Sequence, residues 1–135
     1  MPLFKTLVYV HGPGIAVVTE TWATPCVAES ELSILGYAYL RNDSDQSHGG
    51  GSCIYIKQPL KLLPLNYRKF ATVEESCWLR VVLKDNYSLL VGCVYRPPNA
   101  SKEYDFRLMR AFHVTADSNL KNCLIAGDIN LPEVQ

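Results

Sequence analysis

Residues 92–99 are Gly92-Cys93-Val94-Tyr95-Arg96-Pro97-Pro98-Asn99, an apolar run that ends in a tyrosine, an arginine and a Pro-Pro turn. A short run of this composition is typical of a strand covered on both faces. The two prolines stiffen the exit from that strand and hold the Tyr95 ring in place. The stretch therefore predicts a buried strand that delivers a polar group to one rim of a sheet.

Two other segments have the same design. Residues 16–22 carry a β-branched run into the carboxylate of Glu20, and residues 124–132 carry an apolar run into Asp128 and Asn130. Gly127 allows the backbone a tight exit at that point. The three segments together predict strands that bring ionisable side chains to one rim, as in a metal-dependent phosphodiesterase site.

The rest of the chain predicts layered sheets with helices outside. We expect a short helix over 27–35 that Gly36 closes, and strands over 37–41, 52–57, 77–83, 88–95 and 123–126. The turn at 85–86 joins two of these strands into an antiparallel hairpin. A helix from Ser101, its N-cap, to about 117 should lie on the sheet. Its apolar residues at helical spacing are Phe106, Met109, Phe112 and Ala116.

Composition limits the class of protein. The 135 residues suffice for one domain, and 48% hydrophobic residues suffice for a core. Thirteen basic residues balance thirteen acidic ones, so any contact with nucleic acid must be local. The five cysteines form an odd set without a CxxC pair, which favours reduced core thiols and an intracellular protein. No stretch predicts a signal peptide or a membrane span.

Each candidate side chain has a chemical role and a plain structural one. Glu20 suits a hard cation, although a solvated carboxylate at a strand end would look the same. Asp128 and Asn130 stand two apart and share one face of an extended segment, where they could orient water and bind a phosphate oxygen; Gly-Asp-x-Asn is also a good turn. The Tyr95 hydroxyl suits a phosphate but equally a core edge. Arg96 would add local positive charge for the substrate, or only solubility.

Five segments in fixed order resemble the endonuclease/exonuclease/phosphatase superfamily, which has the DNase I-like fold. Within it, the set is most similar to the apurinic-type endonuclease domain that precedes the reverse transcriptase in non-LTR retrotransposons. The segments are residues 19–22, 49–57, 77–79, 90–99 and 124–132. The resemblance implies an α/β fold, a four-layer αββα sandwich with mainly antiparallel, mixed sheets.

The resemblance also implies residue roles. Glu20 would bind Mg²⁺, with Mn²⁺ as a substitute, and Tyr95 would contact the phosphate. Asn99 would be the counterpart of an asparagine that closely follows the tyrosine in relatives and serves the substrate. Asp128 would orient or deprotonate the attacking water, and Asn130 would assist it on the phosphate.

Two family features are absent from this sequence. The family begins with a strand that carries a metal-binding asparagine, and residues 1–14 contain no asparagine. The family's Ser-Asp-His-type closing segment is also absent. We therefore expect residues 1–135 to form a single partial domain with an incomplete sandwich. Its exposed sheet edges and apolar faces would favour self-association.

The resemblance implies Mg²⁺-dependent nicking of DNA, which would leave a 3′-hydroxyl for a neighbouring reverse transcriptase, in the nucleus. We expect the 135 residues alone to be inactive. One alternative is a superfamily phosphatase or phosphodiesterase that acts on lipid, inositol phosphate or RNA. Another is a catalytically dead remnant with at most nucleic-acid binding. Residues 95–99 favour the retrotransposon group.

Overall fold

The computed structural model describes residues 2–19, 21, 29–42, 51–65, 73, 76–83, 87–116 and 122–130. Along the chain they form α1 (Pro2–His11), β1 (Ile15–Thr19), α2 (Glu29–Leu32), β2 (Tyr37–Asn42), β3 (Ser52–Lys57), β4 (Lys61–Pro64), β5 (Cys77–Val82), β6 (Ser88–Tyr95), α4 (Lys102–Ala116) and β7 (Asn122–Asp128). None of the helices in this part of the chain is long and apolar enough to cross a membrane.

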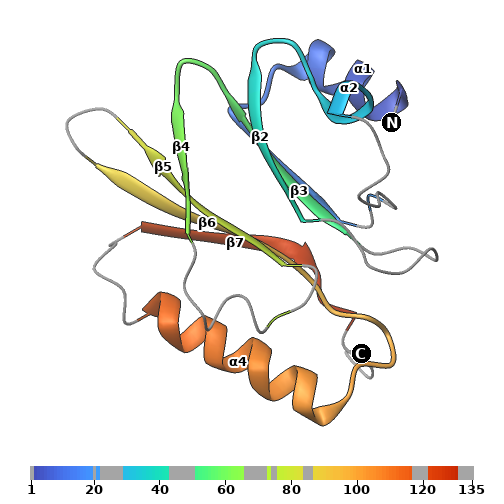
Figure 1. Cartoon of the computed structure of the whole chain (residues 1–135), viewed down its shortest axis with the longest axis vertical. Coiled ribbons are helices and arrows are strands. Elements are labelled where there is room, and N and C mark those ends of the chain that lie inside the picture. The colour runs from blue at the N-terminus through green and yellow to red at the C-terminus, as the bar shows by residue number, and fades with distance from the viewer. Residues whose placement is uncertain are drawn as a thin grey trace.

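The strands form two sheets. One has the order β1-β3-β2 and the other β4-β5-β6-β7. All neighbours pair antiparallel except β6 and β7, which are parallel because α4 carries the chain back between them. The sheets are layered with α1 and α2 outside one and α4 outside the other (Figure 1). This is the expected αββα arrangement of mixed, mostly antiparallel sheets.

Three apolar clusters hold the four layers together. Between the sheets, Ile54 and Ile56 of β3 pack with Leu79 and Val91 of the second sheet. Alternate residues Cys53 and Tyr55 of β3 face the other way, toward Val8 of α1. The side-chain period of two in a strand explains this division, since β3 is buried on both faces. The Tyr55 hydroxyl donates to the Leu32 carbonyl at 2.6 Å, which fixes α2 to the same layer.

Most predicted elements are confirmed. β2 and β3 begin where the sequence predicts, and the β5–β6 hairpin is antiparallel with Cys77 opposite Cys93. Ser101 is the N-cap of α4, because its Oγ accepts from the Tyr104 amide at 3.0 Å. β4 is not predicted, and α2 is shorter than the 27–35 pattern implies. Helix α1 spans residues for which the sequence predicts no element.

The predicted face of α4 is wrong. Phe106 and Met109 are 64% and 53% exposed, whereas the buried residues of the helix are Tyr104, Leu108, Ala111 and Thr115. The inner face packs on Trp78, Leu90 and Val94 of the second sheet. The helix is therefore rotated about its axis so that Phe106 and Met109, its more apolar side chains, do not face the sheet.

The cysteines agree with the prediction of reduced thiols. In the described residues, Cys53, Cys77, Cys93 and Cys123 form no disulfide, and the first three are buried. Burial raises the pKa of the Cys93 thiol to about 12, and it raises that of Cys77 as well. These two thiols therefore pack as small apolar groups. Cys26 lies outside the described residues.

Candidate active site at the ends of β6 and β7

Two predicted site residues end adjacent strands. Tyr95 is the last residue of β6 and Asp128 the last of β7, and the two are partners in the parallel register. Tyr95 is 9% exposed and Asp128 is half-buried. The sheet therefore places the phenol and the carboxylate together at one rim, as the sequence predicts.

Gly127 permits this close approach. Its φ is +146°, and a Cβ built on it would lie 1.8 Å from the Val94 carbonyl oxygen. A side chain is excluded there by backbone, which cannot move aside cheaply. The glycine thus lets β7 lie directly against β6 one residue before Asp128.

The segment after β7 is a turn, which is the plain structural alternative that the sequence offers for Gly-Asp-x-Asn, and not an extended segment. Asn130 has a φ of +42°, and its amide donates to Asp128 Oδ1 at 3.2 Å. An aspartate that accepts from the amide two residues on forms an Asx turn, and asparagine tolerates a positive φ better than most residues. A turn, and not an extended strand, therefore keeps Asp128 and Asn130 close together at the end of β7.

Arg96 connects the end of β6 to this turn. Its amide donates to the Asp128 carbonyl at 2.8 Å, and its carbonyl accepts from Asn130 Nδ2 at 2.8 Å. The guanidinium Nη1 donates to the Asn130 carbonyl at 2.7 Å. The backbone and the side chain of Arg96 thus bind both Asp128 and Asn130, the two ends of the turn.

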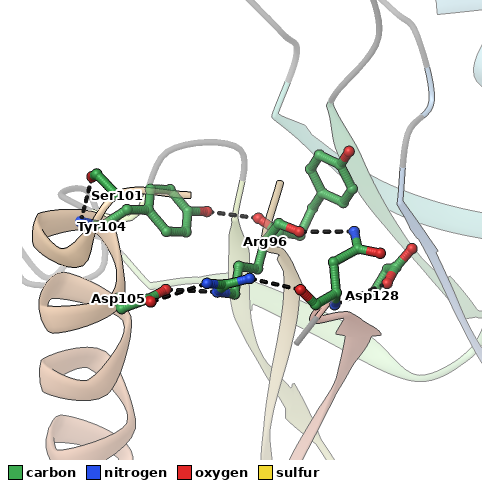
Figure 2. Close-up of polar contacts among 7 residues, drawn as sticks. Arg96, Ser101, Tyr104, Asp105 and Asp128 are labelled. Atoms are coloured by element: carbon green, nitrogen blue, oxygen red, sulfur yellow. Dashed lines mark hydrogen bonds and ion pairs between the residues drawn. The ribbon is translucent and has the colours of Figure 1, made fainter. Parts of the chain in front are cut away.

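Helix α4 supplies the other side of this arrangement. Arg96 Nε and Nη2 donate to the two carboxylate oxygens of Asp105 at 2.6 and 3.0 Å, and the Tyr104 hydroxyl donates to the Tyr95 carbonyl at 2.6 Å. Figure 2 shows the Arg96 side chain between Asp105 on the helix and Asp128 at the end of β7. The hydrogen bonds from Arg96 hold the pKa of the Asp105 carboxyl below its ordinary value, and those to Asp105 raise the pKa of Arg96.

Asn99 lies on the loop between β6 and α4. It is exposed, in a turn where the Ala100 amide donates to the Pro97 carbonyl at 3.1 Å. Asn99 is therefore exposed on the turn that follows the buried end of β6.

Glu20, the predicted metal ligand, lies outside the described residues. It directly follows Thr19, the last residue of β1, and β1 contacts both β6 and β7. Val18 of β1 accepts from the Cys93 thiol at 3.5 Å.

The described residues contain no group of three His, Cys, Asp or Glu side chains that could hold a metal ion. Asp128 brings a carboxylate to the rim, and Asn130 brings an amide oxygen beside the Nδ2 that binds Arg96. Oxygen donors of this kind are those that Mg²⁺ prefers. The two described donors are thus of the chemical kind that a hard cation takes.

Solved structures share this architecture. An AP endonuclease from Leishmania major matches with a TM-score of 0.67 and 15% identity, over 94% of this chain and 49% of the other. The chain has the DNase I-like fold. An AP endonuclease from Archaeoglobus fulgidus matches with a TM-score of 0.62 and 17% identity, over 96% and 52%. ANGEL2, a 2′,3′-cyclic phosphatase, matches with 0.62 and 11%, over 98% and 44%.

These DNase I-like neighbours are members of the endonuclease/exonuclease/phosphatase superfamily. The chain spans about half of the length of the structures that it matches. No protein-family model matches the sequence, nor does the sequence of any curated protein. The likeness is therefore one of fold, at low sequence identity.

Sequence reasoning missed Tyr104 and Asp105 at the site. Asp105 falls in the first turn of the helix, where an acidic residue is already explained by a favourable interaction with the helix dipole. Asp105 lies nine residues after Arg96, and the segment between them includes a turn and the start of a helix, so no periodic pattern in the sequence links the two side chains. The sequence shows only that an arginine at the end of a predicted strand is followed by an aspartate early in the next predicted helix.

Proposed function

We propose that this domain hydrolyses phosphodiester bonds in DNA with Mg²⁺, as the nicking endonuclease domain of a retrotransposon-type protein. The observation that supports it is the convergence of Tyr95, Asp128 and Asn130 at one rim of a DNase I-like sandwich. A bound Mg²⁺ would neutralise charge on the phosphoryl oxygens. In this proposal Glu20 and oxygen donors at the rim hold it, and Mn²⁺ can replace it.

The residues of this chain divide the work. The Asp128 carboxylate is half-buried at the rim, where its Oδ1 accepts from the Asn130 amide and its Oδ2 can take a proton from water or orient it. Asn130 Nδ2 has two hydrogens, of which one binds the Arg96 carbonyl, so the other is left for a phosphate oxygen. Tyr95 would position the phosphate with its hydroxyl, and Asn99 would bind the DNA from the exposed loop.

Cleavage would leave a 3′-hydroxyl that a neighbouring reverse transcriptase extends in the nucleus. The described residues bring together only part of such a site, since they hold no cluster of three metal-ligating side chains. We therefore expect the 135 residues alone to nick DNA weakly or not at all. Linkage to the rest of a longer protein would then restore the activity.

The test is nicking of supercoiled plasmid, in Mg²⁺ or EDTA, by the purified chain and by the longer protein that would contain it. Variants Glu20→Gln and Asp128→Asn remove the proposed ligand and the proposed base with little change of shape. Glu103→Gln is the matched control, because that carboxylate is exposed on α4 and binds only Arg107 of its own helix in the described contacts. Nicking that Mg²⁺ supports and both site variants abolish, with the control unchanged, supports the proposal.

A superfamily phosphatase or phosphodiesterase is the second candidate, favoured by the likeness to the 2′,3′-cyclic phosphatase. Hydrolysis of a 2′,3′-cyclic phosphate that Asp128→Asn abolishes, without plasmid nicking, would replace the first proposal. DNA binding without turnover of either substrate, in the chain and in its longer parent, would identify a non-catalytic remnant.

A further inference from the structure

Arg96 is a buried cation directly after the end of β6. It is 5% exposed, and three of its guanidinium hydrogen bonds go to protein atoms: two to the Asp105 carboxylate and one to the Asn130 carbonyl. A planar guanidinium matches a carboxylate with two parallel bonds, which fixes its orientation as well as its position. Asp105 therefore determines where the third bond points.

That third bond falls on the turn that carries the proposed catalytic groups. Together with the Arg96 amide and carbonyl it gives three hydrogen bonds between Arg96 and residues 128–130. These bonds hold Asn130 at a φ of +42°, a region that asparagine tolerates but that non-glycine residues adopt less often than the negative φ regions. Without the guanidinium, this turn would keep two bonds to Arg96 and its internal Asx bond.

We propose that Asp105 and Arg96 are positioning residues that hold Asp128 and Asn130 in place from helix α4, and that Arg96 acts through this turn instead of binding the substrate. Its catalytic consequence rests on the proposed function, but the structural coupling does not. Catalysis depends on placing reacting groups closely, so loosening the turn would slow the chemical step more than it weakens binding.

The first experiment measures the coupling without any substrate. Amide hydrogen exchange by NMR reports separately on the Arg96 and Asn130 amides, which both donate to Asp128. In Asp105→Asn and Arg96→Gln we expect both amides to exchange about 10-fold faster, while amides within β5 keep their rates. Glu103→Gln, on the same turn of α4, should leave all of them unchanged.

The conservative variant separates positioning from general stability. Asp105→Glu keeps a carboxylate for the guanidinium, so it should restore most of the protection that Asp105→Asn removes. Uniformly faster exchange across both sheets would mean that Asp105 only stabilises the fold. Unchanged exchange at Asn130 in Asp105→Asn would overturn the inference outright.

The second experiment uses plasmid nicking by the full chain or its longer parent. Asp105→Asn should lower kcat about 10- to 100-fold with KM changed less than about twofold. A raised KM with kcat intact in Arg96→Gln would instead make Arg96 a substrate-binding residue. If neither the chain nor its longer parent nicks DNA, the proposed function fails, and hydrogen exchange still decides the positioning.

Discussion

Glu103 and Asp105 stand two apart in the first turn of α4, yet their surroundings differ. Glu103 pairs with Arg107 four residues on at 3.3 Å, with its side chain 80% exposed, an arrangement that contributes little to stability in water. Asp105 receives two bonds from a nearly buried guanidinium. Two carboxylates on one turn of α4 therefore contribute differently to stability, because only that of Asp105 has a nearly buried partner.

The pH dependence of stability should reveal this difference. The Asp105 pKa is lower in the folded than in the unfolded chain, so its contribution is fully present above the unfolded value of about 3.9 and is lost as the pH falls through the folded value. Urea unfolding followed by tryptophan fluorescence should show Asp105→Asn less stable than wild type at pH 6. The gap should narrow below about pH 4.

The matched variant for that measurement is Glu103→Gln, which should follow the wild-type curve at every pH. A constant gap between Asp105→Asn and wild type from pH 6 to pH 3 would contradict a stabilising charge on Asp105. The loss of stability in Asp105→Asn would then come from packing or hydrogen-bond geometry and not from the charge.

Gly127 gives a second prediction at the same scale. Gly127→Ala must relieve both a positive φ and a Cβ contact with the Val94 carbonyl, so it should cost roughly 1–3 kcal/mol of stability or more. Gly14→Ala is the control, because a Cβ there meets nothing within 4 Å, and it should stay within about 0.5 kcal/mol. Equal unfolding free energies for the two variants would show that β7 does not lie this close to β6 in solution.

At the level of elements, α4 shows where amphipathic reasoning fails. Both helix faces carry large apolar residues, so the spacing of Phe106 and Met109 fits a helix but does not identify its inner face. Tyr104 and Asp105 fix the rotation through their bonds to the end of β6. Exposed Phe106 then stacks with Arg110, its ring centroid 5.8 Å from the guanidinium carbon.

Two truncations on α4 test that rotation. Leu108→Ala removes a side chain that is 5% exposed and should destabilise by about 2–5 kcal/mol, whereas Phe106→Ala should stay within about 1 kcal/mol. Urea denaturation of both variants is the measurement. The reverse order of stabilities would return the helix to the face that its hydrophobicity indicates.

At the level of the whole molecule, apolar surface lies outside the three clusters. Leu3, Leu7 and Val10 recur along one face of α1 at helical spacing, and all three are exposed while Phe4 and Val8 pack inward. Leu124 is exposed on β7, which has β6 as its partner in the described sheet. Both features are typical of surfaces that associate.

We therefore expect the isolated chain to self-associate. Light scattering should give a mass that rises with protein concentration, and the double substitution Leu3→Lys with Leu7→Lys should lower it toward one chain. Leu35→Lys is the control, since Leu35 is 85% exposed and belongs to the segment after α2, not to α1. A single-chain mass at every concentration, with one cooperative urea transition, would refute the expectation.

The sequence alone determines the strands other than β4, the β5–β6 hairpin and the N-cap of α4, because these depend on local periodicity and on prolines and glycines. It also places Tyr95 and Asp128 at strand ends. Only the tertiary structure decides the face of α4 and the attachment of Arg96 to Asp105 and to the turn at 128–130. Both depend on hydrogen bonds between buried donors and acceptors that are far apart in the sequence. Such pairs produce no periodic pattern of residues along the chain.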